Sequence, residues 1–467
     1  MSKLKTILYC LASLPPFLLG LLALSTFSPL SSGGLTLGLT LGLALLGCAA
    51  FCWKVLRGGA PRRGGAYAVL LGAVLCAVLG TGALWRHRYE AFKKGCAAKG
   101  WPTSLADFRE DRGEADFAGP LLEKAYARLG LESAKKELDA WSGPVLKPGE
   151  SRPGGAWVRS CAGLESGAAD PALGRPRLVP VDYGAAAADP LNVPLPAMVP
   201  LITFGRCLRA CASRAPDERR AWAQVVRLQK LAALAASHRS TIGQAVACEF
   251  DAQAAKAALE VLARRPGAVL PEAAARGLRE RLRMNRLSEG LRSELAMSFD
   301  LTAWYEGKGS AGASRIGERV LSWAGFFEAN GLAFGRMLAA FAAVRSREDA
   351  AGAAARVQSE LEGLPGWPYV LARIAMPDFR RTFGREFEAR TWCRLALAAS
   401  AAGRWRAAKG RFPKDLAELG PDEALDETTG RPLVLRKPSG GGIELCGGGP
   451  EGDAKDSRGQ DFCARLR

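Results

Sequence analysis

Three stretches of the chain have residue types and spacings that could support catalysis or cofactor binding. Ser133 and Lys136 have the S-x-x-K spacing that places a lysine one helical turn from a serine nucleophile. Residues 307–312, GKGSAG, match the G-x-G-x-x-G pattern of dinucleotide phosphate loops, and His238 is of the type that serves as a general base. None has its required companions: no S-D-N or K-T-G element, no predicted strand before residue 307, and no nucleophile with an orienting acid for the histidine. The sequence therefore indicates no convergent catalytic set.

The composition excludes several classes of active site. His87 and His238 are the only histidines among 467 residues, which leaves almost nothing for a His-rich zinc site or a Ser-His-Asp triad. No C-x-x-C pair occurs, so we expect no structural zinc site. The formal net charge of +18 admits nucleic acid, anionic lipid or an acidic protein as a partner. The absence of a basic sheet with interleaved aromatic residues argues against nucleic acid.

Three long apolar stretches open the chain, at residues 6–27, 35–53 and 66–85. Each is about 20 residues long, which is enough to cross a bilayer, and none contains a charge. We predict three transmembrane helices, with a cleaved signal peptide as the alternative for the first, since Lys3 and Lys5 precede it. The basic loop around Arg62 and Arg63 predicts a cytoplasmic second loop. The rest of the chain is then expected in the periplasm of a bacterial inner-membrane protein.

The remainder of the sequence predicts a mainly α protein with a small α+β module at its C-terminal end. Between residues 195 and 405, apolar residues recur at helical spacing between Pro and Gly breaks. This pattern is typical of antiparallel helical hairpins, arranged as a bundle or as a solenoid-like array, although no fixed-period repeat occurs. The predicted domains are a membrane domain, a helix followed by an irregular Gly/Pro-rich region, the large helical domain and the C-terminal module, at residues 1–88, 89–194, 195–405 and 406–467.

One predicted helix, at residues 276–292, is strongly basic. Its arginines alternate with leucines that form an apolar stripe, and they are Arg276, Arg279, Arg281, Arg283, Arg286 and Arg292. Such a helix fits either contact with anionic lipid headgroups or a solvated face. Glu280 and Glu289 partly compensate the charge, which favours the solvated face.

The C-terminal region contains a series of turn signals in a defined order. A Phe-Pro turn precedes a short helical segment, a T-G-R-P turn follows, and two predicted strands lead to a G-P-E-G loop, at residues 412–413, 429–432, 433–436, 443–446 and 449–452. This order resembles the globular end of type II secretion pseudopilins and related modules of uncharacterised bacterial membrane proteins. The resemblance covers about the last 65 residues. The chain lacks the processing site and single N-terminal helix of pseudopilins, so pilus assembly does not carry over.

The resemblance implies a small folded module with an acidic loop. In that loop Glu451, Asp453 and Asp456 would supply oxygen ligands to a calcium ion. The alternative is an acidic loop that faces water without an ion. Apart from calcium, no cofactor is expected.

Cysteines provide a further structural prediction. Four of the 12 lie in the apolar stretches, which leaves eight: Cys96, Cys161, Cys207, Cys211, Cys248, Cys393, Cys446 and Cys463. The C-terminal module is small and its Gly runs add to the entropy lost on folding, so we predict that a Cys446–Cys463 disulfide closes it. Free thiols at both positions are the alternative, and such a bond requires a location outside the cytoplasm. Cys207 and Cys211, one helical turn apart, could be core thiols.

These features lead to a functional hypothesis. We expect a non-enzymatic, membrane-anchored envelope protein that presents a periplasmic helical domain for protein binding or assembly. Its expected partners are the membrane, anionic lipids and envelope proteins. The alternative is a membrane-anchored hydrolase or transferase whose site no sequence pattern reveals.

Overall fold

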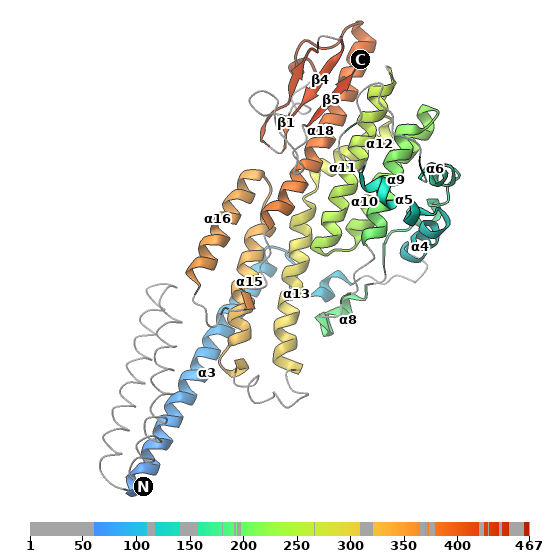
Figure 1. Cartoon of the computed structure of the whole chain (residues 1–467). Coiled ribbons are helices and arrows are strands. Elements are labelled where there is room, and N and C mark those ends of the chain that lie inside the picture. The colour runs from blue at the N-terminus through green and yellow to red at the C-terminus, as the bar shows by residue number, and fades with distance from the viewer. Residues whose placement is uncertain are drawn as a thin grey trace.

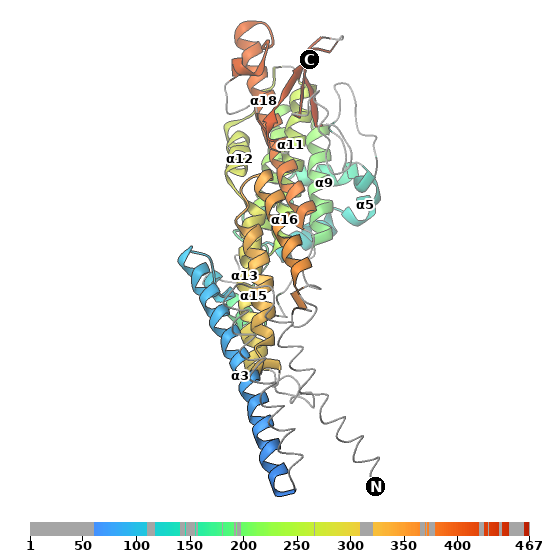
Figure 2. The same cartoon turned by 90° about the vertical axis from the view of Figure 1, so that its left-hand side faces the viewer.

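The computed structural model is mainly helical, with a small antiparallel sheet at the C-terminal end (Figure 1). It describes residues 60–109, 117–140, 157–179, 181–190, 198–265, 267–308, 321–364, 379–419, 425–427, 429–438, 441–447 and 462–466, with single positions at 145, 155, 193, 369, 371 and 372. The long helix α3 (Ala60–Ala98) begins at one end of the molecule, and the sheet lies at the other end (Figures 1 and 2).

Three long helices form the centre of the first hydrophobic cluster: α9 (Met198–Arg214), α10 (Glu218–Ser237) and α11 (Thr241–Arg264). Each turn between them is closed by a helix cap. Asp217 accepts a hydrogen bond from the backbone N–H of Arg220 at the start of α10, and Ser240 accepts one from Gly243 at the start of α11. These side chains satisfy N–H groups that would otherwise have no partner, so the two helices begin at fixed residues.

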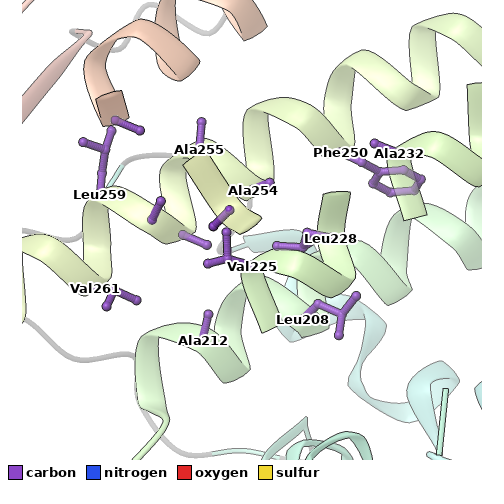
Figure 3. Packing of buried hydrophobic residues seen from close by; sticks show 14 of the residues in the cluster. Leu208, Ala212, Val225, Leu228, Ala232, Phe250, Ala254, Ala255, Leu259 and Val261 are labelled. Carbon is purple, nitrogen blue, oxygen red and sulfur yellow. The ribbon is translucent and has the colours of Figure 1, made fainter. Parts of the chain in front are cut away.

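Small residues allow these helices to pack closely. Alanines alternate with larger side chains along the contact, as Figure 3 shows for Leu208, Val225 and Phe250. At Gly205, an added Cβ would lie 2.6 Å from the ring of Phe250, so only glycine fits there. Packing at this density makes the region sensitive to the addition of even a single methyl group.

A second hydrophobic cluster is built from α3 and three later helices, α13 (Arg286–Lys308), α15 (Phe326–Ala342) and α16 (Arg347–Gly363). The long helix α18 (Phe379–Lys409) joins the two clusters. Its Phe383 and Phe387 belong to the second cluster, whereas Trp392 and Leu395 belong to the first. The helix α12 (Glu272–Arg283) leads into α13 through a short turn.

Four shorter helices pack on α9 and α10: α4 (Gly119–Arg128), α5 (Leu131–Ala140), α6 (Trp157–Glu165) and α7 (Asp170–Leu173). Their apolar side chains, among them Trp157 and Leu164, complete the first cluster. A 3-10 helix at Leu105–Phe108 and α8 (Tyr183–Ala188) pack instead on each other and on α13, in a small separate cluster.

The C-terminal module packs on α11 and α18. After a 3-10 helix at Leu416–Leu419, it contains a two-strand ribbon and a three-strand sheet of order β3-β4-β5, with strands β1 (Leu425–Asp426), β2 (Arg431–Pro432), β3 (Val434–Arg436), β4 (Ile443–Cys446) and β5 (Cys463–Leu466). All neighbouring strands are antiparallel. The ring of Phe462 packs 5.0 Å from that of Trp392, and Thr391 donates a 2.5 Å hydrogen bond to the buried carboxylate of Asp426. These contacts attach the module to α18.

The prediction of transmembrane helices disagrees with the structure. Residues 6–27 and 35–53 lie outside the described residues, whereas residues 66–85 form part of α3. Among the described residues, no helix combines the length and the apolar character that a membrane crossing requires. The prediction of a membrane domain with three transmembrane helices is therefore wrong. The predicted location, an inner-membrane protein with a periplasmic domain, is wrong for the same reason.

The reason lies in what the end of the third apolar stretch contacts. Trp85 is 2% exposed and Tyr89 is 5% exposed, because both pack in the second cluster. At Gly82 an added Cβ would collide with the carbonyl oxygen of Trp323, so α3 lies directly against the chain that precedes α15. Hydropathy does not distinguish a side chain that faces lipid from one that faces protein. The helix also continues through residue 88 to Ala98, and α18 continues through residue 405, so neither predicted boundary ends a helix.

Candidate anion-binding site

A buried cluster of two arginines and two carboxylates holds the turn between α12 and α13. The guanidinium of Arg281 donates a hydrogen bond of 3.1 Å to Glu386 Oε1, and its Nε lies 2.8 Å from Asp251 Oδ2 as an ion pair whose N–H does not point at the oxygen. Arg286 Nε donates to the same Asp251 oxygen at 2.8 Å. The two positive and two negative charges balance, which is the condition for burying charged groups at tolerable cost.

Glu386 also acts as the N-terminal cap of α13. Its two carboxylate oxygens accept hydrogen bonds of 2.9 Å from the backbone N–H groups of Arg286 and Leu287. A carboxylate at this position satisfies free N–H groups and interacts favourably with the helix dipole. Arg281 in turn donates a 3.0 Å hydrogen bond to the carbonyl oxygen of Met284. The turn is therefore fixed to α11 and α18 from both of its sides.

Beside this turn lies a pocket of about 370 Å³ with a strongly basic lining. Four arginines contribute to it, and they come from three separate parts of the chain: Arg283 and Arg292 flank the α12–α13 turn, Arg345 precedes α16, and Arg390 lies on α18. The other lining residues are Trp101, Met284, Asn285, Ala342, Ala343 and Val344. No carboxylate is among these residues of the described chain.

The four guanidinium groups are only partly satisfied. Arg390 donates to the carbonyl oxygen of Leu282 at 3.1 Å and forms an ion pair with Glu427, and Arg292 donates to Glu289 at 3.1 Å. The Nε atoms of Arg292 and Arg390 are nevertheless buried without an acceptor among the described residues.

The other two arginines have still fewer contacts. In the described part of the chain, no carboxylate lies within ion-pair distance of the guanidinium of Arg283 or Arg345, although the charge of Arg345 helps to lower the pKa of Asp349. The guanidinium of Arg292 also lies 5.7 Å from the ring centre of Trp101, which fixes one wall of the pocket. The pocket thus offers N–H donors that a bound anion would satisfy.

The wall opposite the α12–α13 turn is the turn between α15 and α16. The carbonyl oxygen of Val344 accepts hydrogen bonds from the side chains of Asn285 and Ser288, the latter at 2.8 Å. Asp349 accepts hydrogen bonds from the backbone N–H groups of Arg345 and Ser346, at 3.1 and 3.0 Å, and these bonds lower the pKa of its carboxyl group. The backbone that carries Arg345 is therefore held in place while its side chain stays exposed.

The predicted basic helix at residues 276–292 is not one continuous helix in the structure. Residues 276–292 form two helices, α12 and α13, which are separated at Met284 and Asn285. Arg281 and Arg286 are buried in the ion cluster, whereas Arg283 and Arg292 line the pocket. Arg345, Arg390 and Trp101 carried no sequence signal, because they lie far from this segment in the chain.

Of the other candidate residues for a disulfide or a calcium ion, two form a disulfide and the rest lie outside the described residues. Cys446 and Cys463 face each other in β4 and β5 and form a disulfide, with Cα atoms 4.1 Å apart. The proposed calcium ligands Glu451, Asp453 and Asp456 lie outside the described residues, as do positions 309–312 of the glycine motif.

Two residues that were considered for catalysis lie at turns between helices. His238 is buried at the α10–α11 turn, where its Nδ1 lies 2.7 Å from the Oγ of Ser240, the residue that caps α11. The hydroxyl of Ser133 donates to the carbonyl oxygen of Gly130 at 2.8 Å, so it closes the turn that precedes its helix. These contacts indicate that both residues stabilise turns.

No protein-family model, curated protein or solved structure matches the chain. The chemistry that the pocket offers is anion recognition, since guanidinium groups bind carboxylates and phosphates through paired N–H donors. Within the described lining there is no serine, cysteine, histidine or carboxylate to act as a nucleophile or general base.

Proposed function

We propose that this chain is a non-enzymatic binding protein whose arginine pocket holds a carboxylate side chain from an acidic segment of a partner protein. The observation that carries the proposal is the gathering of Arg283, Arg292, Arg345 and Arg390 around a pocket whose described lining contains no carboxylate. Four positive charges around one cavity repel one another, and a bound anion would relieve this repulsion.

Two further properties favour a protein segment as the ligand. The rim of the pocket is open, since Met284 is 44% exposed and Arg283 and Arg345 are exposed. An exposed methionine beside basic groups suits a peptide, which combines apolar and acidic side chains. The net charge of +18 would also steer an acidic partner toward the protein at low salt.

The test is a binding measurement with an acidic peptide. We expect a fluorescein-labelled oligoglutamate peptide to bind the full chain, with an affinity that falls as salt is raised. The double substitution Arg283→Glu with Arg345→Glu should weaken binding at least about tenfold, since a charge-assisted hydrogen bond contributes about 1.5–3 kcal/mol. Fluorescence polarisation measures both effects.

A matched variant separates the pocket from the overall charge. Arg219→Glu with Arg276→Glu changes the net charge by the same amount, and both side chains are exposed on α10 and α12 outside the pocket. This variant should bind almost as tightly as the unmodified chain. Equal losses in the two variants, or no binding by the unmodified chain, would show that the pocket is not the site.

A further inference from the structure

Three cysteine sulfurs meet where α6 packs on α9. Cys161 lies on α6, and Cys207 and Cys211 lie one turn apart on α9. Cys161 and Cys211 form a disulfide with Cα atoms 5.3 Å apart, and the Sγ of Cys207 lies 3.8 Å from that of Cys211. All three sulfurs lie within 4.8 Å of one another. The sulfur of Cys207 therefore lies beside the disulfide without being part of it.

The surroundings of these sulfurs are apolar. All three residues are buried in the first hydrophobic cluster, and among the described residues no histidine or carboxylate completes the group as a fourth ligand. Burial raises the pKa of the Cys207 thiol to about 12, with no contribution from a charged neighbour. Cys207 is thus a neutral thiol at neutral pH and a poor nucleophile toward the neighbouring disulfide.

The arrangement suits a ligand that accepts three sulfurs. Sulfurs that share one bound ion lie within about 4 Å of one another, since metal–thiolate bonds are about 2.3 Å long, and the Cys207–Cys211 separation of 3.8 Å falls within this limit. After reduction, the sulfurs of Cys161 and Cys211 would separate to a similar distance. Both residues lie on packed helices, which keep the two sulfurs close together after reduction.

Charge decides which ion the site can hold. Three thiolates around Zn²⁺ leave a net charge of −1, and around Cu⁺ a net charge of −2, and no charged group of the described residues acts on the Cys207 thiol to compensate. An uncompensated charge in an apolar interior costs several kcal/mol. Zinc also requires a fourth ligand, which the described residues do not supply. A trivalent ion is the one for which three thiolates give a neutral complex.

We propose that the reduced chain binds one trivalent, thiophilic metalloid through Cys161, Cys207 and Cys211. A thiol reductant first converts the Cys161–Cys211 disulfide into two thiols and is itself oxidised to a disulfide. Arsenite, As(OH)₃, then condenses with the three thiols: three S–H and three As–O bonds break, three As–S bonds form, and three water molecules leave. Neither charge nor oxidation state changes in this second step, so the neutral interior is preserved.

The experiment is native mass spectrometry of the full chain, reduced with a phosphine that does not chelate arsenic and then titrated with arsenite. We expect one adduct that has gained an arsenic atom and lost three hydrogens. A two-sulfur site, such as reduced Cys446 and Cys463, would instead keep a hydroxyl on the arsenic, so the mass alone distinguishes the two. Peptide mapping of the adduct should place it on Cys161, Cys207 and Cys211.

Substitutions complete the test. Cys207→Ser should abolish the three-sulfur adduct and weaken arsenite binding at least about tenfold, whereas Cys393→Ser, a buried thiol on α18, should change neither. If Cys207→Ser does not fold, the mapping on the unmodified chain still decides the question. A two-sulfur adduct only, unchanged binding by Cys207→Ser, or displacement of arsenite by an equal concentration of Zn²⁺ would each overturn the proposal.

Discussion

Replacing Glu386 by alanine should lower the free energy of unfolding by about 3–5 kcal/mol, the range found when one partner of a buried ion pair is removed. The side chain of Glu386 is 1% exposed, and so is that of its partner Arg281. Its loss would leave Arg281 with Asp251 as its remaining carboxylate, and Asp251 is already shared with Arg286. It would also leave two backbone N–H groups at the start of α13 without an acceptor.

Urea denaturation, followed by circular dichroism, measures this change. Glu280→Ala on the exposed face of α12 is the matched control and should stay within about 0.5 kcal/mol of the unmodified chain. Replacing both partners, as Arg281→Met with Glu386→Leu, should recover part of the loss, because no unpaired charge is then buried. A Glu386→Ala variant as stable as the Glu280→Ala control would contradict the role assigned to the ion cluster.

The same substitution connects stability with binding. Arg283 lies next to the turn that Glu386 and Arg281 fix in place, so a loosened turn would no longer hold this arginine at the pocket. We therefore expect Glu386→Ala to weaken oligoglutamate binding as well, under conditions in which the variant is still folded.

Removing the Cys446–Cys463 disulfide should destabilise the C-terminal module by about 3 kcal/mol, as expected for a bond that closes a loop of this length. The two residues are 17 positions apart and pair directly across β4 and β5. The sheet has three short strands, and its buried apolar side chains form a small core: Leu433, Ile443, Leu445, Phe462, Ala464 and Leu466. The bond restricts the unfolded chain and thereby compensates for this small core.

Hydrogen exchange of the Cys446→Ser, Cys463→Ser double variant tests this prediction strand by strand. Amide protection in β3, β4 and β5 should fall by about two orders of magnitude, while protection in α10 and α11 should stay unchanged. Cys76→Ser, an exposed thiol on α3, provides the control. Unchanged exchange in the three strands would show that packing against α18 alone stabilises the module.

Several elements could be predicted from the sequence because their causes are local. The two strands expected at residues 433–436 and 443–446 correspond to β3 and β4, since the turn residues between them and the alternation of side chains act over a few positions. The Pro and Gly breaks likewise mark the ends of helices such as α12, which follows Pro271. The mainly helical character of residues 195–405 has the same origin, in the helical spacing of Ala and Leu.

The apolar stretch at residues 66–85 shows where local reasoning ends. Its composition predicts burial along its whole length, whereas the structure buries its end: Trp85 is 2% exposed and Leu79 is 48% exposed. Contacts with residues more than 200 positions away, such as that of Arg86 with Glu328 at 2.7 Å, belong to the tertiary structure. Sequence periodicity carries no information about such partners.

Only the tertiary structure determines which residues come together in the arginine pocket and in the three-cysteine cluster. The arginines at 281, 283, 286 and 292 are chemically identical in the sequence, yet packing buries two of them with carboxylates of α11 and α18 and places the other two at a pocket. The sulfur of Cys161 meets those of α9 for a similar reason, since α6 docks on α9 through the apolar side chains around it. In both cases the deciding interactions join residues that are tens to hundreds of positions apart, and their geometry follows from how whole helices pack.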